Sequence, residues 1–264
     1  MSNITHLIEK IRDENPLIHN ITNQVVVNFT ANGLLALGAS PVMANAKEEA
    51  ADMARIADAL VLNIGTLTSP QIEAMTEAGK AANEKGIPVV FDPVGVGATP
   101  WRNKVAAKIL DTVHITAIRG NAGEIGALAG VDTKMKGVDS VFEGSNKEIA
   151  VKAAKQLGVP VIVTGKEDII TDGHKLYVGR NGDSILTRVT GAGCLLSSVI
   201  AAFLTVERNP VDAAAGAVSF YGIAAELAAV KAAGPGSFQS TFLDTLYQLD
   251  PEQIKAKIKL EQGE

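Results

Sequence analysis

The 264-residue sequence is poor in cysteine, in aromatic residues and in positive charge. It has one cysteine, which excludes an internal disulfide and a zinc site built from several thiolates. Aromatic residues make up 4% of the chain and the formal net charge is −5, so the basic face and stacking rings typical of nucleic-acid binding are missing. We therefore expect no nucleic-acid partner.

Membrane and export signals are also missing. Residues 1–16 mix polar and apolar side chains with charges of both signs, and they lack the basic start and unbroken apolar stretch of a signal peptide. The most apolar segment, residues 195–206, is shorter than the roughly 20 residues that cross a bilayer. We expect a cytoplasmic protein that does not contact the membrane.

Two common nucleotide-binding sequence motifs are incomplete in this chain. Residues 95–100 read GVGATP, with Pro100 where a dinucleotide-binding loop needs its third glycine. The Gly165-Lys166 pair is followed by Glu167 and has no glycine five positions before it, so a P-loop is absent. Neither a Rossmann dinucleotide site nor a P-loop is supported.

Short β-branched runs alternate with longer Ala-, Glu- and Lys-rich segments up to residue 191. This alternation predicts a mainly parallel sheet with helices on both faces, and nearly all-apolar strands fit a sheet covered on both sides. The expected strands are 41–44, 59–65, 88–94, 114–120 and 160–165, with a hairpin over 168–180. The expected helices are 24–37, 46–57, 69–85, 101–111, 121–129 and 146–157.

After residue 191 the alternation of strand and helix patterns stops, and the remainder of the chain is predicted to be helical. The expected helices there are 192–206, 210–233, 237–247 and 250–260. No linker, repeat or low-complexity stretch is seen, and residues 131–145 are the expected mobile loop. We therefore expect residues 1–264 to form one α/β domain with a helical C-terminal part.

The stretch TGAGC, residues 190–194, places two glycines at the start of an apolar helix. Glycines let backbone N–H groups approach a ligand, and a helix start presents free N–H groups with partial positive charge. The stretch therefore indicates an anion site. A glycine-rich turn before a buried helix is an equally good explanation of these residues alone.

Polar side chains follow several expected strands. Asp92 can hold a metal or a ligand hydroxyl, or it can cap its own turn. Arg119 can pair with a phosphate, while Asn121 and Glu124 begin a helix with the spacing of a capping box. Thr164 can touch a phosphate or simply end its strand. Because the carboxyl ends of parallel strands meet at one rim, we expect these groups to converge with TGAGC.

Residues 19–45 are rich in asparagine. Asn23 stands where a helix over 25–37 begins, and Met43 lies at the end of an expected strand. Taken alone, Asn23 fits a capping or turn residue and Met43 fits the core.

Together, five segments resemble the hydroxyethylthiazole kinase family of the ribokinase-like superfamily. They are HNITN (19–23), ALGASPVMA (36–44), VFDPVGVGA (90–98), IRGNAGEI (118–125) and VTGAGC (189–194). They occur in the family's order, and the resemblance extends from about residue 15 to residue 245. Residues 121–124 also resemble the NxxE metal motif of the superfamily, and residues 191–194 resemble its GAGD anion-hole motif.

The resemblance implies a ribokinase-like three-layer sandwich without a separate lid domain. It implies ATP-dependent phosphorylation of the primary alcohol of 4-methyl-5-(2-hydroxyethyl)thiazole with Mg²⁺, in a homotrimer whose active sites lie at subunit interfaces. The implied contacts are ATP at Arg119 and Thr164, thiazole at Asn23, Met43 and Gly191, and magnesium, partly through water, at Asp92 and Glu124.

The resemblance also implies that the backbone amides of Gly191, Ala192, Gly193 and Cys194 hold the transferring phosphoryl group. Cys194 stands where the superfamily's Asp normally takes the alcohol proton. A thiol with an ordinary pKa of ~8.5 is only a few per cent ionised near pH 7. A helix start lowers such a pKa, whereas burial and a triphosphate raise it. We expect Cys194 to assist proton removal modestly and mainly to shape the pocket.

Three other interpretations stay open. The nearest is a kinase of the same superfamily for another small alcohol, such as hydroxymethylpyrimidine or a sugar. The second is a cysteine hydrolase with Cys194 as nucleophile and His19 as the candidate base. The third is a nucleotide-binding protein without catalytic activity.

Overall fold

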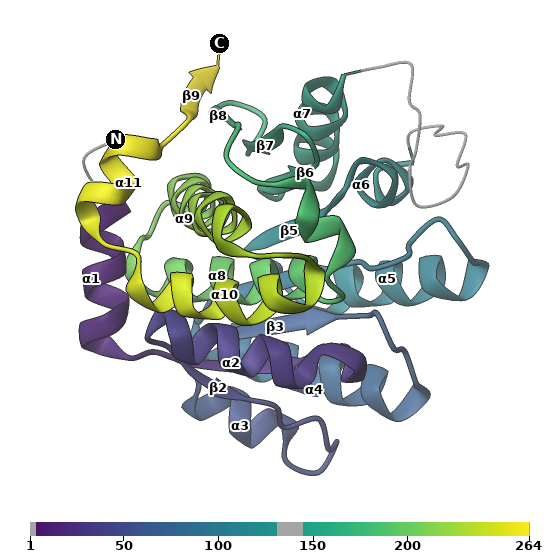
Figure 1. The fold of residues 1–264 in the computed structure, drawn as a ribbon. Helices are drawn as coiled ribbons and strands as arrows, with labels where there is room; N and C mark the ends of the chain where they lie inside the picture. Colours follow the sequence, from purple (N-terminus) through teal and green to yellow (C-terminus); the bar gives the residue numbers. More distant parts are fainter. Residues whose placement is uncertain (1–3, 131–144, 264) are drawn as a thin grey trace.

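The computed structural model describes residues 4–130 and 145–263 (Figure 1). The expected mobile loop over 131–145 lies outside the described residues, apart from Ser145. The described strands form one nine-stranded sheet in the order β2-β1-β3-β4-β5-β6-β7-β8-β9. Their bounds are β1 Leu17–Ile21, β2 Ser40–Val42, β3 Ala59–Asn63, β4 Val89–Asp92, β5 Ala117–Asn121, β6 Val161–Thr164, β7 Asp168–Thr171, β8 Leu176–Gly179 and β9 Leu260–Gly263.

The strands from β2 to β6 run parallel to their neighbours, and β7, β8 and β9 are each antiparallel to the strand before them in the sheet. The mainly parallel sheet predicted from the alternating pattern is therefore confirmed. The predicted hairpin is β7 and β8, whose turn places Gly173 at φ +92°. Glycine adopts that left-handed conformation without a Cβ clash, which explains Asp-Gly at this turn.

Helices cover both faces of the sheet. One face carries α1 Ile4–Glu14, α2 Val27–Leu37, α8 Ala192–Val206, α9 Pro210–Lys231, α10 Pro235–Gln248 and α11 Pro251–Lys257. The other carries α3 Ala50–Ile56, α4 Ser69–Lys85, α5 Pro100–Thr112, α6 Ala122–Leu128 and α7 Asn146–Leu157. Alternate residues of each parallel strand enter opposite cores; in β3, Val61 faces one cluster and Leu60 and Leu62 face the other. The result is the predicted three-layer α/β sandwich.

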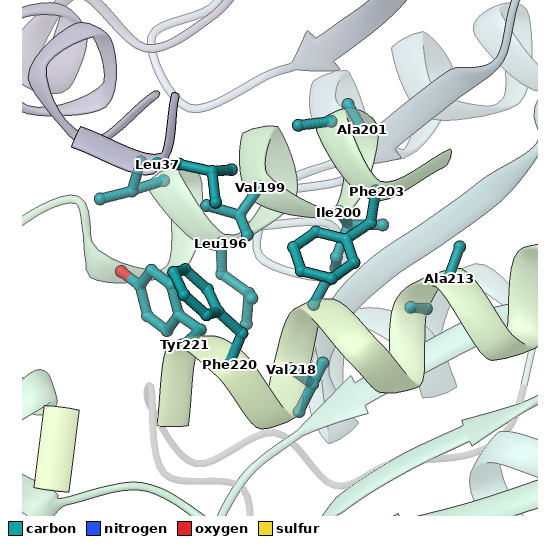
Figure 2. Packing of buried hydrophobic residues seen from close by; sticks show 14 of the residues in the cluster. Leu37, Leu196, Val199, Ile200, Ala201, Phe203, Ala213, Val218, Phe220 and Tyr221 are labelled. Carbon is teal, nitrogen blue, oxygen red and sulfur yellow. The ribbon is translucent and has the colours of Figure 1, made fainter. Parts of the chain in front are cut away.

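Helix α8 is fixed in the middle of one face because it is apolar on nearly all sides. Every residue from 195 to 204 is buried, and α8 packs against β3, β4 and α9. Figure 2 shows Phe203 of α8 beside Phe220 of α9, with ring centroids 6.0 Å apart. Truncating one such buried ring typically destabilises a protein by about 3–5 kcal/mol. This packing holds the start of α8, and with it TGAGC, at a set place over the sheet.

Helix α9 is long and apolar enough to cross a membrane by length and composition, with a mean hydropathy of 1.5. However, 78% of its apolar stretch is buried inside the protein, as expected for the core helix of a packed domain. The shorter segment 195–206, which is the most apolar stretch of the sequence, lies in α8. Both segments are core helices.

Some boundaries differ from the prediction. Strand β1 was not expected, because His19 and Asn20 interrupt its apolar pattern; both are buried and hydrogen-bonded, to Ala44 O and Ser198 Oγ. The helix expected over 250–260 ends at Lys257, and the chain then pairs with β8 as β9. That pairing is non-local, so no local pattern signals it.

Candidate active site

The carboxyl ends of the six parallel strands carry one row of side chains, which are polar except for Met43. In sheet order the row contains Met43 after β2, Asn23 after β1, then Asn63, Asp92, Arg119 and Thr164 at β3 to β6. Neighbouring strands lie about 4.8 Å apart, so the row spans about 24 Å. We refer to these residues, with Glu124 and the turn at 191–194, as the carboxyl-end row. The structure thus places the predicted residues on one rim of the sheet.

The turn at 191–194 begins α8 without a side-chain cap. Gly191 is the N-cap at φ +90°, and a Cβ there would come within 2.6 Å of Val26. Ala192 N donates to Val189 O at 3.4 Å, and because the cap has no side chain, the N–H groups of Gly193 and Cys194 are left for another acceptor. Tyr221 donates a hydrogen bond to the Ala192 carbonyl over 2.7 Å and so ties the turn to α9.

Arg119 lies directly against this turn. A Cβ on Gly193 would lie 2.5 Å from Arg119 Nη1, so the guanidinium can take its place only because residue 193 is glycine. Arg119 Nη2 donates to Thr164 Oγ1 over 2.6 Å, and Nη1 lies 3.8 Å from Asp92 Oδ2. Among the described residues, Arg119 Nε is buried and has no partner. The guanidinium is therefore held in place, but it still has an N–H group that the described part of the chain leaves without a hydrogen-bond acceptor.

The Asp92 carboxylate is fully buried and is held from one side. Its Oδ2 accepts hydrogen bonds from Asn63 Nδ2 at 2.9 Å and from Ser197 Oγ at 2.7 Å. Its Oδ1 is also buried but has no partner in the described part of the chain. Burial raises the pKa of Asp92 to about 6, while the nearby Arg119 charge opposes that shift. A buried unpaired carboxylate oxygen is costly unless something binds it.

Glu124 forms the capping box that its spacing predicts. Its Oε2 accepts from Asn121 N, and Asn121 Oδ1 accepts from Glu124 N, both at 2.9 Å. Its Oε1 accepts from Gly95 N, also at 2.9 Å, and so joins the loop after β4 to the start of α6. Each carboxylate oxygen keeps a further lone pair, and Glu124 is close enough to raise the pKa of Asp92.

The Cys194 thiol is half-buried, and burial is the main reason that its pKa rises to about 11. The charges of Asp92 and Glu124 raise it further, whereas a hydrogen bond from Asn63 and the Arg119 charge lower it. Burial and the two carboxylates therefore outweigh the opposing effects of Asn63 and Arg119 on the pKa of this thiol.

His19 is not placed to act as a base for Cys194. Its Nε2 faces the Ala44 carbonyl at 2.7 Å, and burial lowers its pKa. No contact among the described residues pairs the two side chains, so the hydrolase interpretation lacks its base.

Asn23 and Met43 lie at the other end of the row. Asn23 Oδ1 accepts from Val25 N at 2.9 Å and caps the 3-10 helix Gln24–Val26, as its position predicts. Met43 follows β2 directly and is half-buried, so the core interpretation of this residue is wrong. No contact within the described residues joins Met43 to Arg119 or Cys194.

Sequence reasoning missed four residues that hold the row: Asn63, Ser197, Tyr221 and Arg102. Arg102 donates to the carbonyls of Ile64, Gly65 and Val94 and so joins the loops after β3 and β4. Asn63 had a usable signal, since it is the polar residue that ends an apolar strand. The other three have no local signal, because their partners are distant in sequence.

Comparison with known proteins agrees with this geometry. Residues 8–252 match the model of the Hydroxyethylthiazole kinase family. A solved hydroxyethylthiazole kinase protein from Pyrococcus horikoshii OT3 is 43% identical, with full coverage of both chains and a TM-score of 0.93. The pyridoxal kinase from Staphylococcus aureus in complex with ADP is 18% identical over 80% of this chain and 87% of that chain, with a TM-score of 0.62. That second likeness shows the fold alone.

Proposed function

The chain belongs to the hydroxyethylthiazole kinase family, and on that premise we propose that the carboxyl-end row is where it transfers a phosphoryl group from ATP to the thiazole alcohol. The protein is a kinase that phosphorylates 4-methyl-5-(2-hydroxyethyl)thiazole for thiamine salvage. The observation that carries the proposed site is the pair of unsatisfied buried groups, Asp92 Oδ1 and Arg119 Nε, beside an uncapped helix start.

The two substrates are assigned to opposite ends of the row. Arg119 and Thr164 would contact ATP, because a guanidinium fork suits phosphate oxygens. Asn23, Met43 and Gly191 would contact the thiazole at the opposite end. The transferring phosphoryl group would then lie over the turn at 191–194.

Asp92 and Glu124 fit a magnesium ion better than they fit a transition-metal centre. Among the described residues no three His, Cys, Asp or Glu side chains cluster, as a site built from protein ligands alone requires. Mg²⁺ needs only one or two carboxylates, with phosphate oxygens and water completing its shell. Asp92 Oδ1 is buried and free for such a ligand, and Glu124 would act partly through water. When bound, the ion neutralises charge on the β- and γ-phosphate oxygens.

The chain's own contribution is mainly positioning and charge stabilisation. The backbone N–H groups of Gly191, Ala192, Gly193 and Cys194 would donate to the phosphoryl oxygens as negative charge develops, and Ala192 would first give up its long 3.4 Å bond to Val189 O. Cys194 stays protonated near neutral pH, since its pKa is about 11. A loose, metaphosphate-like transfer needs little early deprotonation of the alcohol, so a poor base suffices.

The assembled enzyme is proposed to be a cytoplasmic homotrimer with active sites at subunit interfaces. Val25, which follows Asn23 at the thiazole end, is 71% exposed. Leu35 of α2 and Tyr247 of α10, two helices that pack together, are 57% and 70% exposed toward the amino ends of β1 and β2. Large exposed apolar side chains on these neighbouring elements favour a protein partner. Light scattering on the purified protein would test this, and a monomer at micromolar concentration would refute the trimer.

Residues 1–264 are proposed to act as one kinase domain. Strand β1 begins at Leu17 and β9 ends at Gly263, and both belong to the same sheet. The first experiment is a panel of alcohols that includes the thiazole, hydroxymethylpyrimidine and a sugar, with phosphorylated products identified by mass spectrometry. Turnover fastest with hydroxymethylpyrimidine would overturn the assignment of the thiazole.

A further inference from the structure

Asn63 is a buried amide at the centre of the carboxyl-end row, with 1% of its surface exposed. It ends β3, between the strands that carry Asn23 and Asp92. Its Nδ2 donates to Asp92 Oδ2 and its Oδ1 accepts from Gly65 N, both at 2.9 Å. It is also a hydrogen-bond partner of Cys194.

The orientation of this amide is fixed by its partners. A carboxylate oxygen accepts hydrogen bonds, so Nδ2 must face Asp92, and the Gly65 N–H can only donate, so Oδ1 must face Gly65. The second hydrogen on Nδ2 is then available to the sulfur of Cys194. An asparagine supplies this combination of one acceptor and two donors, whereas an aspartate of the same shape would not.

The bond from Asn63 has a direct consequence for Asp92. Asn63 and Ser197 both donate to Oδ2, so the carboxylate cannot rotate without breaking two hydrogen bonds inside the core. Its Oδ1 is consequently held free of protein partners. We propose that Asn63 is a positioning residue for phosphoryl transfer. By holding Asp92 Oδ2, it orients Asp92 Oδ1 toward the magnesium–nucleotide complex, and it also positions the Cys194 thiol beside Asp92.

The Gly65 bond extends this role toward the thiazole end. A Cβ on Gly65 would lie 2.5 Å from Asn23 Nδ2, so the loop after β3 packs closely on Asn23. By holding Gly65 N, Asn63 fixes that loop as well as Asp92. The inference rests on the proposed site, because it assumes that Asp92 faces the magnesium–nucleotide complex.

Asn20 provides a matched control. It lies on the neighbouring strand β1 and is also 1% exposed. Its Nδ2 donates to Ile18 O at 2.8 Å, and its Oδ1 accepts from Ser198 Oγ of α8 at 2.7 Å. It therefore matches Asn63 in residue type and burial, and each of its two amide atoms is likewise hydrogen-bonded inside the protein, but neither of its partners is a residue proposed to bind a ligand.

The test compares Asn63→Ala with Asn20→Ala in the full-length enzyme. Melting temperature, kcat, the KM for thiazole, and calorimetric ADP binding with Mg²⁺ or with EDTA are measured for both. Loss of a residue that orients a metal ligand typically reduces metal affinity or activity by about 10–100-fold. We expect such a fall in kcat for Asn63→Ala, a thiazole KM within about 3-fold of wild type, and loss of the Mg²⁺-dependent part of ADP binding.

Asn20→Ala is expected to lower the melting temperature comparably while leaving kcat and the Mg²⁺ dependence of ADP binding intact. Equal kcat losses in the two variants, or unchanged Mg²⁺ dependence in Asn63→Ala, would overturn the inference. If Asn63→Ala does not fold, Asn63→Asp keeps the shape but faces Asp92 with a second carboxylate, and the same losses are expected. Absence of thiazole turnover in the wild type would refute the proposed function, while the ADP-binding comparison would still decide the role of Asn63.

Discussion

Arg119 Nη2 donates a hydrogen bond of 2.6 Å to Thr164 Oγ1, and this bond joins the ends of the neighbouring strands β5 and β6. It holds the guanidinium against Gly193, in the position where the start of α8 and the Asp92 carboxylate also meet. The catalytic proposal depends on this placement, because it puts a fixed positive charge beside the free N–H groups of the turn.

Replacing Thr164 with Val keeps the shape of the side chain but removes the acceptor for Arg119. A hydrogen bond to a charged group contributes about 1.5–3 kcal/mol, so we expect the KM for ATP to rise by about 10-fold or more. Steady-state kinetics at saturating thiazole measure this. Thr164→Ser retains the hydroxyl and is expected to stay near wild type; identical KM values for the Ser and Val variants would contradict the role of the bond.

Adding a methyl group at Gly193 should displace Arg119. The new Cβ would lie 2.5 Å from Nη1, closer than any stable contact. We expect Gly193→Ala to lower kcat/KM for ATP by at least about 10-fold, since one misplaced charge-stabilising group costs that much or more. Gly236→Ala, where a Cβ meets nothing within 4 Å, is the control. Wild-type kinetics in Gly193→Ala would show that Arg119 can move without consequence.

Cys194 is expected to be a weak base at most. Its pKa of about 11 leaves the thiol protonated at neutral pH. Cys194→Ala should therefore reduce kcat by less than the ~100-fold that marks a full general base. Rapid-quench kinetics measure the rate of the chemical step directly. A loss in that rate far beyond ~100-fold would mean that the thiol takes the alcohol proton.

Asp92 should make the metal-free protein less stable as pH rises. Burial raises its pKa from 3.8 to about 6, so the folded state binds the proton more tightly than the unfolded state. The contribution of Asp92 is fully present below about pH 3.8 and is lost as pH rises through about 6, which amounts to about 3 kcal/mol by pH 8. Asn at this position accepts the same two hydrogen bonds without ionising.

We therefore expect the melting temperature of Asp92→Asn, relative to wild type, to increase between pH 4 and pH 7 and then level off. Calorimetry in EDTA-containing buffers measures this difference. The same variant should have little kinase activity, because the free carboxylate oxygen is gone. A melting-temperature difference that does not change with pH would contradict the raised pKa.

The sequence predicts the layers of this fold well, because alternating apolar patterns report burial directly. The strand-helix order, the parallel sheet and the hairpin at Asp172-Gly173 all follow from such local signals. Strand β1 does not, since His19 and Asn20 look polar until Ala44 and Ser198 satisfy them. Tertiary hydrogen bonds of this kind have no signature along the chain.

The residues of the candidate site likewise include some whose positions the sequence predicts and some whose positions it does not. The positions of Asp92, Arg119 and Thr164 follow from the rule that parallel strands end at one rim. The supporting contacts of Asn63 and Ser197 do not, because they depend on which strand lies beside β4 and on how α8 is rotated. The direction of the Cys194 pKa shift cannot be predicted from the sequence either, because burial is its largest cause and burial is a property of the packed structure.

Formation of ADP by the purified protein tests the central claim most directly. It is measured with and without hydroxyethylthiazole, in Mg²⁺ and in EDTA, while thiazole phosphate is followed in parallel. We expect ADP to form only when thiazole and Mg²⁺ are both present, with one thiazole phosphate for each ADP. ADP formation that does not depend on thiazole, or none under any condition, would contradict phosphoryl transfer at the carboxyl-end row.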